Sequence, residues 1–74
     1  MVTSDAPESS TRGRVTAFDP HVGLGQVTTE DEMQIMFHCA EIADGSRSIE
    51  IGQQVRFLVR PKFGRSEAFT IVKT

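Results

Sequence analysis

The side chains that could carry out catalysis are few in this sequence of 74 residues. It has one cysteine, Cys39, and two histidines, His21 and His38, which are too few and too scattered for a zinc site. It contains no nucleophile elbow and no phosphate-cradling loop with a lysine. The acidic triplet at residues 30–32 fits a solvated hairpin turn better than a catalytic carboxylate pair. We therefore expect a protein that is not an enzyme and needs no cofactor or metal.

Another group of residues is better suited to contact than to catalysis. Phe63 lies in the segment PKFGR, between Lys62 and Arg65. An aromatic ring flanked by cations suits nucleic-acid contact, because the ring can stack on bases while the cations attract phosphates. The alternative is that Phe63 anchors its loop by folding back on the domain.

The charges are divided unevenly along the chain. The net charge is −2, which argues against a simple electrostatic grip on phosphates. Residues 13–51 hold two cations and seven anions (2 − 7 = −5), whereas residues 52–74 hold five cations and one anion (5 − 1 = +4). We expect any basic patch to come from the C-terminal third. The alternative is that these charges only keep the domain soluble.

The elements that must position these residues are short strands. Residues 1–12 are polar, rich in Ser and Thr, and predicted to form a disordered tail. Residues 13–74 show five segments with strand composition, at 14–18, 24–29, 33–39, 53–60 and 67–74. Turn signals such as Asp19-Pro20 and Asp44-Gly45 separate them, and only a single helical turn fits, after residue 39.

This pattern predicts one all-β domain over residues 13–74, a small five-stranded antiparallel barrel. The expected core consists of Val15, Val27, Ile35, Phe37, Val55, Phe57, Val59 and Ile71. The sequence has no apolar run of about 20 residues that could cross a bilayer, and from its polar N-terminal residues we expect no secretory signal. Its single cysteine excludes an internal disulfide framework, and we expect a cytoplasmic protein.

An ordered set of residues between Gly13 and Lys73 resembles the bacterial cold-shock domain, a five-stranded OB-fold barrel. The set comprises Gly13-x-Val15 with Phe18, Gly23-x-Gly25, His38, Ala40-x-Ile42, Gly52-Gln53-x-Val55-x-Phe57 and Ala68. No single member of the set is specific to the family, but their order over sixty residues favours this fold. The resemblance implies a domain that binds single-stranded RNA or DNA.

The chain departs from that family where the family's aromatic residues stack on bases. The family typically has K-G-F-G-F-I in the second strand, V-F-V-H-F in the third and a Trp-Phe pair in the first. Here these positions read Val22, Leu24, Gln26, Met36, a retained His38, Cys39 and Ala17-Phe18. Each base stacked on an aromatic ring contributes about 1–3 kcal/mol. Losing four or five rings should therefore weaken binding by roughly two or more decades.

Two hypotheses follow. The first is weakened, low-specificity binding of single-stranded RNA or DNA, with a cold-shock or RNA-chaperone role. The resemblance then places Phe18, Leu24, Gln26, Met36 and His38 against bases, Lys62 and Arg65 against phosphates, and Phe63 as an auxiliary stack. The second is a protein-interaction or homodimerisation module, in which Leu24, Met36 and Cys39 form an apolar contact surface. For Phe18, a structural role in capping one end of the barrel is a further alternative.

Overall fold

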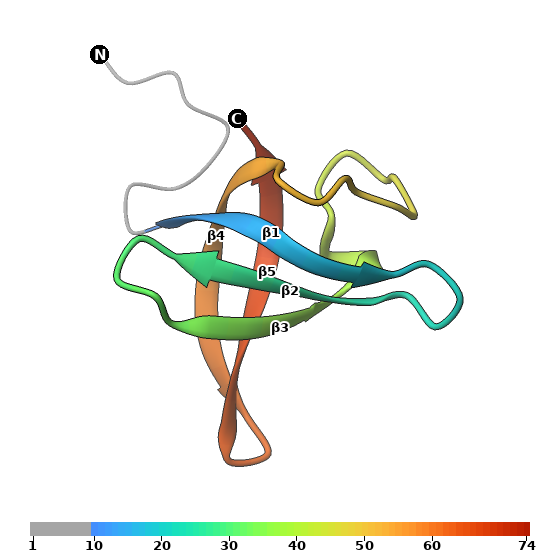
Figure 1. Ribbon diagram of the computed structural model, residues 1–74. Helices are drawn as coiled ribbons and strands as arrows, with labels where there is room; N and C mark the ends of the chain where they lie inside the picture. Colours follow the sequence, from blue (N-terminus) through green and yellow to red (C-terminus); the bar gives the residue numbers. More distant parts are fainter. Residues whose placement is uncertain (1–9) are drawn as a thin grey trace.

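The computed structural model describes residues 10–74, apart from the side chain of Lys62. Its strands are β1 (Thr11–Asp19), β2 (Leu24–Thr29), β3 (Gln34–His38), β4 (Gln54–Lys62) and β5 (Arg65–Lys73), with a 3₁₀ turn, η1 (Cys39–Glu41), after β3. The strands close into a barrel in the order β1-β2-β3-β5-β4 (Figure 1). This architecture confirms the predicted all-β, five-stranded barrel of the OB type.

The predicted strand orientation is wrong at one pair. Four pairings are antiparallel, but β3 and β5 run parallel, with Met36 opposite Glu67. A parallel pair needs a connection of a dozen or more residues, and residues 39–64 supply one that includes η1, the whole of β4 and the turn before β5. Local strand signals could not show this, because they carry no information on which distant strand closes the barrel.

The first strand begins earlier than predicted. Thr11 and Arg12 are part of β1 and lie opposite Phe57 and Arg56 of β4, whereas the sequence placed the domain boundary at Gly13. Their polar character suggested a tail, yet a strand residue whose side chain faces solvent can be polar without leaving the ladder. The rest of the predicted tail, residues 1–9, lies outside the described residues.

The core matches the predicted set at all positions but one. The buried hydrophobic residues are Val15, Val27, Ile35, Phe37, Ile42, Ile49, Val55, Phe57, Ala68 and Ile71. Val59, which was predicted to be buried, is 40% exposed. Val59 comes just after an irregularity in the β4–β5 register, between Arg56 and Leu58, and the hairpin that follows projects from the barrel (Figure 1).

The turns after β1 and β2 form at the positions that their turn-forming residues predicted. After β1, the carboxylate of Asp19 accepts a hydrogen bond from the His21 amide at 2.9 Å. After β2, the Thr29 hydroxyl accepts a hydrogen bond from the Met33 amide at 3.0 Å and is itself hydrogen-bonded to Asp31. Side chains that bond nearby backbone groups in this way stabilise turns. The acidic triplet is therefore a hairpin turn, as expected.

Gly25 is required by the close approach of its strand to an aromatic ring. A Cβ atom at this position would lie 2.4 Å from Cζ and 2.6 Å from Cε1 of the buried Phe37. Both distances are far inside van der Waals contact. The ring of Phe37 thus occupies the space that any side chain on residue 25 would need.

We predict that Gly25→Ala destabilises the fold by about 1–3 kcal/mol, because the added methyl group overpacks the site. The measurement is chemical unfolding of both proteins. The double variant Gly25→Ala/Phe37→Leu should lose less stability than the sum of the two single variants, since a smaller residue 37 makes room for the methyl group. Additive losses would contradict this assignment.

The loop after η1 is joined to the end of β5 by a polar cluster. Asp44 accepts a hydrogen bond from the Ser46 amide at 2.9 Å and forms an ion pair with Lys73 at 3.0 Å. The Ser46 hydroxyl and amide, followed by Lys73, lower the pKa of Asp44 from 3.8 to about 2. These groups stabilise the charged carboxylate in the folded state only.

We predict that this contribution is lost in acid. Because the folded pKa lies below the unfolded one, the stabilisation is complete above about pH 4 and fades as the pH falls towards 2. The thermal midpoint of the wild type should exceed that of Asp44→Asn at pH 6, and the gap should close near pH 2. Glu50→Gln, an exposed carboxylate outside the cluster, serves as control. A gap that persists unchanged to pH 2 would show that the charge is irrelevant.

Candidate nucleic-acid interface

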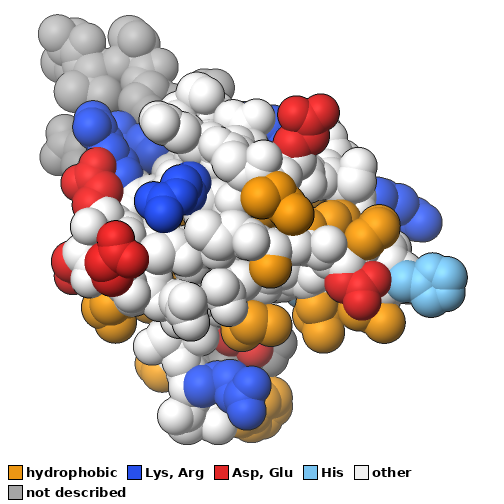
Figure 2. Space-filling view, in the orientation of Figure 1, with side chains coloured by type: hydrophobic (Ala, Val, Ile, Leu, Met, Phe, Trp, Pro, Cys, Tyr) orange, Lys and Arg blue, Asp and Glu red, His pale blue; other side chains and the backbone are white. Residues whose placement is uncertain are grey.

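The predicted base-facing residues meet on one face formed by β1, β2 and β3. Between β2 and β3, Gln26 lies opposite Met36 and Leu24 lies opposite His38. A depression of about 360 Å³ on this face is lined by Ala17, Phe18, Asp19, Val22, Leu24, Gly25, Gln26 and Met36. Hydrophobic side chains gather over the end of β1 and the start of β2 (Figure 2). Four predicted site residues therefore share one hollow, with His38 beside it.

A β-bulge in β1 sets the positions of the residues in this hollow. Thr16 is an extra residue relative to β2, so that Ala17 lies opposite Gln26 and Phe18 opposite Gly25. Without the bulge, simple alternation would reverse which of Ala17 and Phe18 faces outward. Ala17, at the position of the family's Trp, is exposed, and its small side chain leaves the hollow open.

Phe18 has the structural role that the sequence left as one of two alternatives. Its ring stacks on that of Phe37, with 6.1 Å between centroids and 14° between planes, so it covers one end of the core. It is half-buried, and its remaining surface lines the depression. An offset stack of this kind holds the outer ring in place. The phenyl group on the hollow's wall is thus held by the core.

Gln26 is held by a short hydrogen-bond chain that the sequence reasoning missed. Its side-chain amide donates to the Thr16 hydroxyl at 3.2 Å, and that hydroxyl is 2.9 Å from the Thr28 hydroxyl. The carbonyl oxygen of the Gln26 side chain remains able to accept a hydrogen bond from a base. The role of Thr16 depends on the bulge, and the only sequence signal was its place on a short strand next to Ala17-Phe18.

His38 is oriented by the turn that follows it. Its Nδ1 accepts a hydrogen bond from the Ala40 amide at 3.0 Å, which caps η1. In the neutral ring, the proton therefore sits on Nε2, which is left to donate from an exposed side chain. Since Leu24 lies directly across, the donor stands at the edge of the hollow.

The predicted hairpin residues lie apart from this hollow. Phe63 and Gly64 form a two-residue turn between Lys62 and Arg65, and both turn residues have positive φ, of 54° and 81°. Phe63 is 94% exposed, so the alternative of a loop anchor folded onto the barrel is wrong. Arg65 is also exposed, whereas the Lys62 side chain is not among those described. The hairpin begins beside the hollow, because Glu67 of β5 pairs with Met36.

Comparison with known proteins settles the family. The model of the "'Cold-shock' DNA-binding domain" family matches residues 11–74. The chain belongs to the cold-shock domain family. The solved structure of Drosophila Unr CSD456 is similar, with a TM-score of 0.75 and 28% sequence identity. The match covers 90% of this chain and 27% of that one. No curated protein sequence matches significantly.

Membership makes this cold-shock domain a nucleic-acid-binding domain of a non-enzymatic family. Within residues 10–74 there is no cluster of three His, Cys, Asp or Glu residues that could hold a metal ion. The same part of the chain has no helix long and apolar enough to span a membrane.

We predict that Phe63→Asn stabilises this cold-shock domain by up to about 1 kcal/mol. A left-handed backbone is unfavourable for Phe, whereas Asn-Gly is the preferred pair in a two-residue turn with positive φ. Phe63→Ala should bring no such gain, since Ala has no comparable preference for positive φ. Thermal unfolding of the three proteins distinguishes them. If Phe63→Asn were no more stable than Phe63→Ala, the turn would not be strained by Phe63.

Proposed function

We propose that this cold-shock domain binds single-stranded RNA or DNA with low sequence specificity, more weakly than aromatic-rich members of the family. Phe18, Leu24, Gln26, Met36 and His38 form the base-facing surface in this proposal. Lys62 and Arg65 meet phosphates, and Phe63 adds a stack at the hairpin. The observation that carries the proposal is the hollow itself, which assembles Phe18, Leu24, Gln26 and Met36 in one place.

The chemistry of the hollow fits a nucleobase. Leu24 is 44% exposed and Met36 is 38% exposed, so both offer apolar surface that a flat base can cover. The thioether of Met36 is polarizable and makes favourable contacts with aromatic rings. Phe18 supplies one ring, already fixed by Phe37. These contacts are adaptable in shape, and none depends on which base is bound.

The polar groups of the surface are too few for strong base selection. The Gln26 carbonyl oxygen accepts and the His38 Nε2–H donates, whereas discrimination between bases requires several directed hydrogen bonds on each base edge. Binding through apolar contact and phosphate attraction is tolerant of sequence. Because the surface offers few directed hydrogen bonds and relies on apolar and phosphate contacts, we expect low sequence specificity.

The hairpin supports the proposal through its geometry. Phe63 is almost fully exposed while its backbone is in a left-handed conformation, two features that work against stability. Strained and exposed residues of this kind tend to occur at functional sites. A ring held out beside Arg65 is suited to stack on a base next to a bound phosphate.

A titration tests the proposal directly. Fluorescence anisotropy with oligo-dT and oligo-U at low salt should show binding, and His38→Ala and Phe18→Ala should weaken it. Gln53→Ala, a change outside the hollow, is the control. An absence of binding at about 100 μM protein would end the proposal, since that corresponds to less than about 5.5 kcal/mol of affinity. Binding that is unaffected by both variants would show that the base-facing surface lies elsewhere.

We predict that restoring aromatic side chains strengthens binding. Leu24→Phe and Met36→Phe should each add about 1–3 kcal/mol of stacking, which is roughly five- to a hundredfold in affinity. Both positions are exposed, so the fold should accept the larger ring. Ile51→Phe adds a ring at an exposed position outside the hollow and should leave affinity unchanged. Equal affinities for wild type and the Leu24→Phe and Met36→Phe variants would contradict the assignment of the hollow.

An alternative function uses the same hollow for protein contact. Val22, Leu24 and Met36 are exposed apolar side chains that line it, and such patches mark interfaces between proteins as well. A second copy of the chain or another protein would then occupy the hollow in place of bases. Light scattering at high protein concentration tests the homodimer, because a strict monomer removes it.

The cellular role that we infer is of the RNA-chaperone type in the cytoplasm. Weak, sequence-tolerant binding suits a protein that must release its strand readily. Cys39 is free and half-buried in the structure, which is compatible with a reducing compartment. Comparing affinities for RNA and DNA of the same sequence establishes which of the two the surface prefers.

A further inference from the structure

Two arginines lie directly opposite each other on β1 and β4. Arg12 pairs with Arg56 in the antiparallel register, and Arg14 pairs with Gln54 two residues further along. Like charges in directly opposed positions destabilise a sheet. Side chains two residues apart on a strand share a face, so all three guanidinium groups are on the same side. The fold thus gathers three positive charges on one face, although the opposed pair of arginines does not favour the pairing of β1 with β4.

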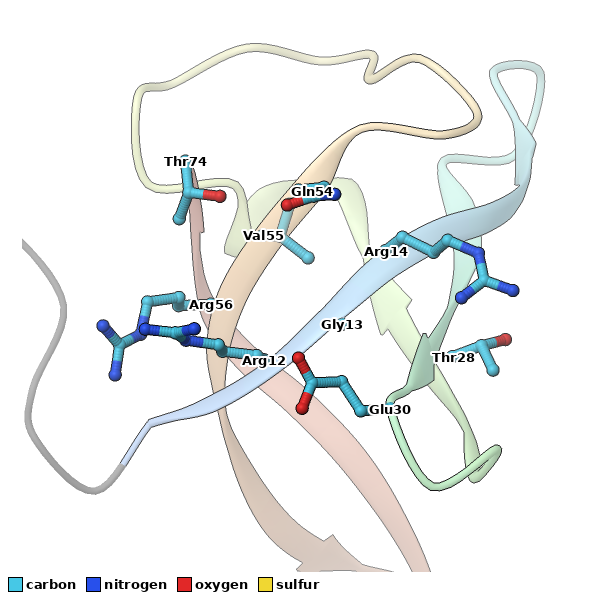
Figure 3. A pocket seen from close by; sticks show the side chains of 9 residues that line it. All are labelled: Arg12, Gly13, Arg14, Thr28, Glu30, Gln54, Val55, Arg56 and Thr74. Carbon is cyan, nitrogen blue, oxygen red and sulfur yellow. The ribbon is translucent and has the colours of Figure 1, made fainter.

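These arginines line a groove that is separate from the hollow. The groove has a volume of about 430 Å³ and is lined by Arg12, Gly13, Arg14, Thr28, Glu30, Gln54, Val55, Arg56 and Thr74. Figure 3 shows Arg12 and Arg56 side by side, with Glu30 between them and Arg14. Glu30 is the one carboxylate side chain among the described lining residues.

The three guanidinium groups are available to a ligand. Within residues 10–74, no ion pair involves Arg12, Arg14 or Arg56. Arg56 donates one hydrogen bond, from Nε to the Ser10 hydroxyl at 2.9 Å. Guanidinium groups are planar donors that match phosphate oxygens in paired hydrogen bonds. The groove therefore has the donor chemistry of a phosphate site.

The groove shares strands β1 and β2 with the base-facing surface, and a chain of hydrogen bonds joins the two. Thr28 lines the groove and hydrogen-bonds Thr16, whose hydroxyl in turn accepts from Gln26 in the hollow. Along β1, the six steps from Arg12 to Phe18 span about 20 Å at roughly 3.3 Å per residue. OB folds engage about 4–16 nucleotides, a length that can reach from one site to the other.

We propose that this arginine groove binds backbone phosphates of the same nucleic-acid strand whose bases occupy the hollow. The inference rests on the proposed function and adds a second contact region to it. It adds a cationic contact on β1 and β4 to the one proposed at the hairpin. An anion between Arg12 and Arg56 would relieve their repulsion, so that binding and the local stability of the barrel are coupled.

The test is the salt dependence of oligonucleotide binding. For single strands, the slope of log K against log salt is about −0.7 for each phosphate neutralised. With an oligonucleotide of about 12 nucleotides, Arg56→Gln should make the slope shallower by about 0.7, and Arg12→Gln/Arg56→Gln by about 1.4. With one of about 4 nucleotides, which covers the hollow alone, the slopes of all variants should agree.

The matched control is Arg47→Gln, the same change of charge at an exposed position outside the groove. Its slope should equal that of the wild type. Equal slopes for wild type and Arg56→Gln on the long strand would overturn the groove while nucleic-acid binding itself stands. If the wild type binds neither strand, the proposed function fails and the groove proposal fails with it.

A second measurement reports on the groove without nucleic acid. Inorganic phosphate, compared with chloride at equal ionic strength, should raise the thermal midpoint of the wild type more than that of Arg12→Gln/Arg56→Gln. The general effect of phosphate on protein stability is common to both proteins and cancels. Equal increases would show that the groove has no anion site.

Discussion

The contact between the ring of Phe37 and the bare Cα of Gly25 is the constraint on which both the core and the site depend. It brings β2 and β3 together around a buried aromatic group, with no room for a side chain on residue 25. Phe18 then stacks on the outer side of the same ring. The hollow's wall is therefore an extension of the core, and its geometry is as rigid as the packing beneath it.

This arrangement explains how a cold-shock domain can lose most of its aromatic surface and keep its shape. Leu24, Gln26 and Met36 stand at positions where the family's aromatic residues stack on bases, and none of the three is part of the core. These three residues change the chemistry of the hollow while Val27, Ile35 and Phe37 continue to fill the interior. Strand alternation separates the two requirements, since successive side chains point to opposite faces.

The net charge of a segment of the chain is a poor guide to where charge gathers on the folded surface. Residues 13–51 are acidic in sum, and the sequence predicted that any basic patch would come from the last third. The barrel instead pairs Arg12 with Arg56 and places Arg14 on the same face, so residues from both parts form one cationic groove. The acidic residues that dominate the sum are largely in turns, for example at 30–32, where they shape the chain. Net charge therefore says little here about where phosphates can bind.

The strand content, most of the core, the turns and the family could be predicted from the sequence alone. This was possible because local pattern governs these features: alternation marks buried faces, and Asp, Pro and Gly mark turns. The candidate site residues were chosen from their positions in the family's motifs, and the structure brings Phe18, Leu24, Gln26 and Met36 together in one hollow. Four features became visible only in the folded barrel: the parallel pairing of β3 with β5, the exposure of Val59, the bulge that turns Phe18 onto Phe37, and the pairing of Arg12 with Arg56. Each of these depends on which distant strands lie side by side, and that information belongs to the closed barrel and to no segment of the chain.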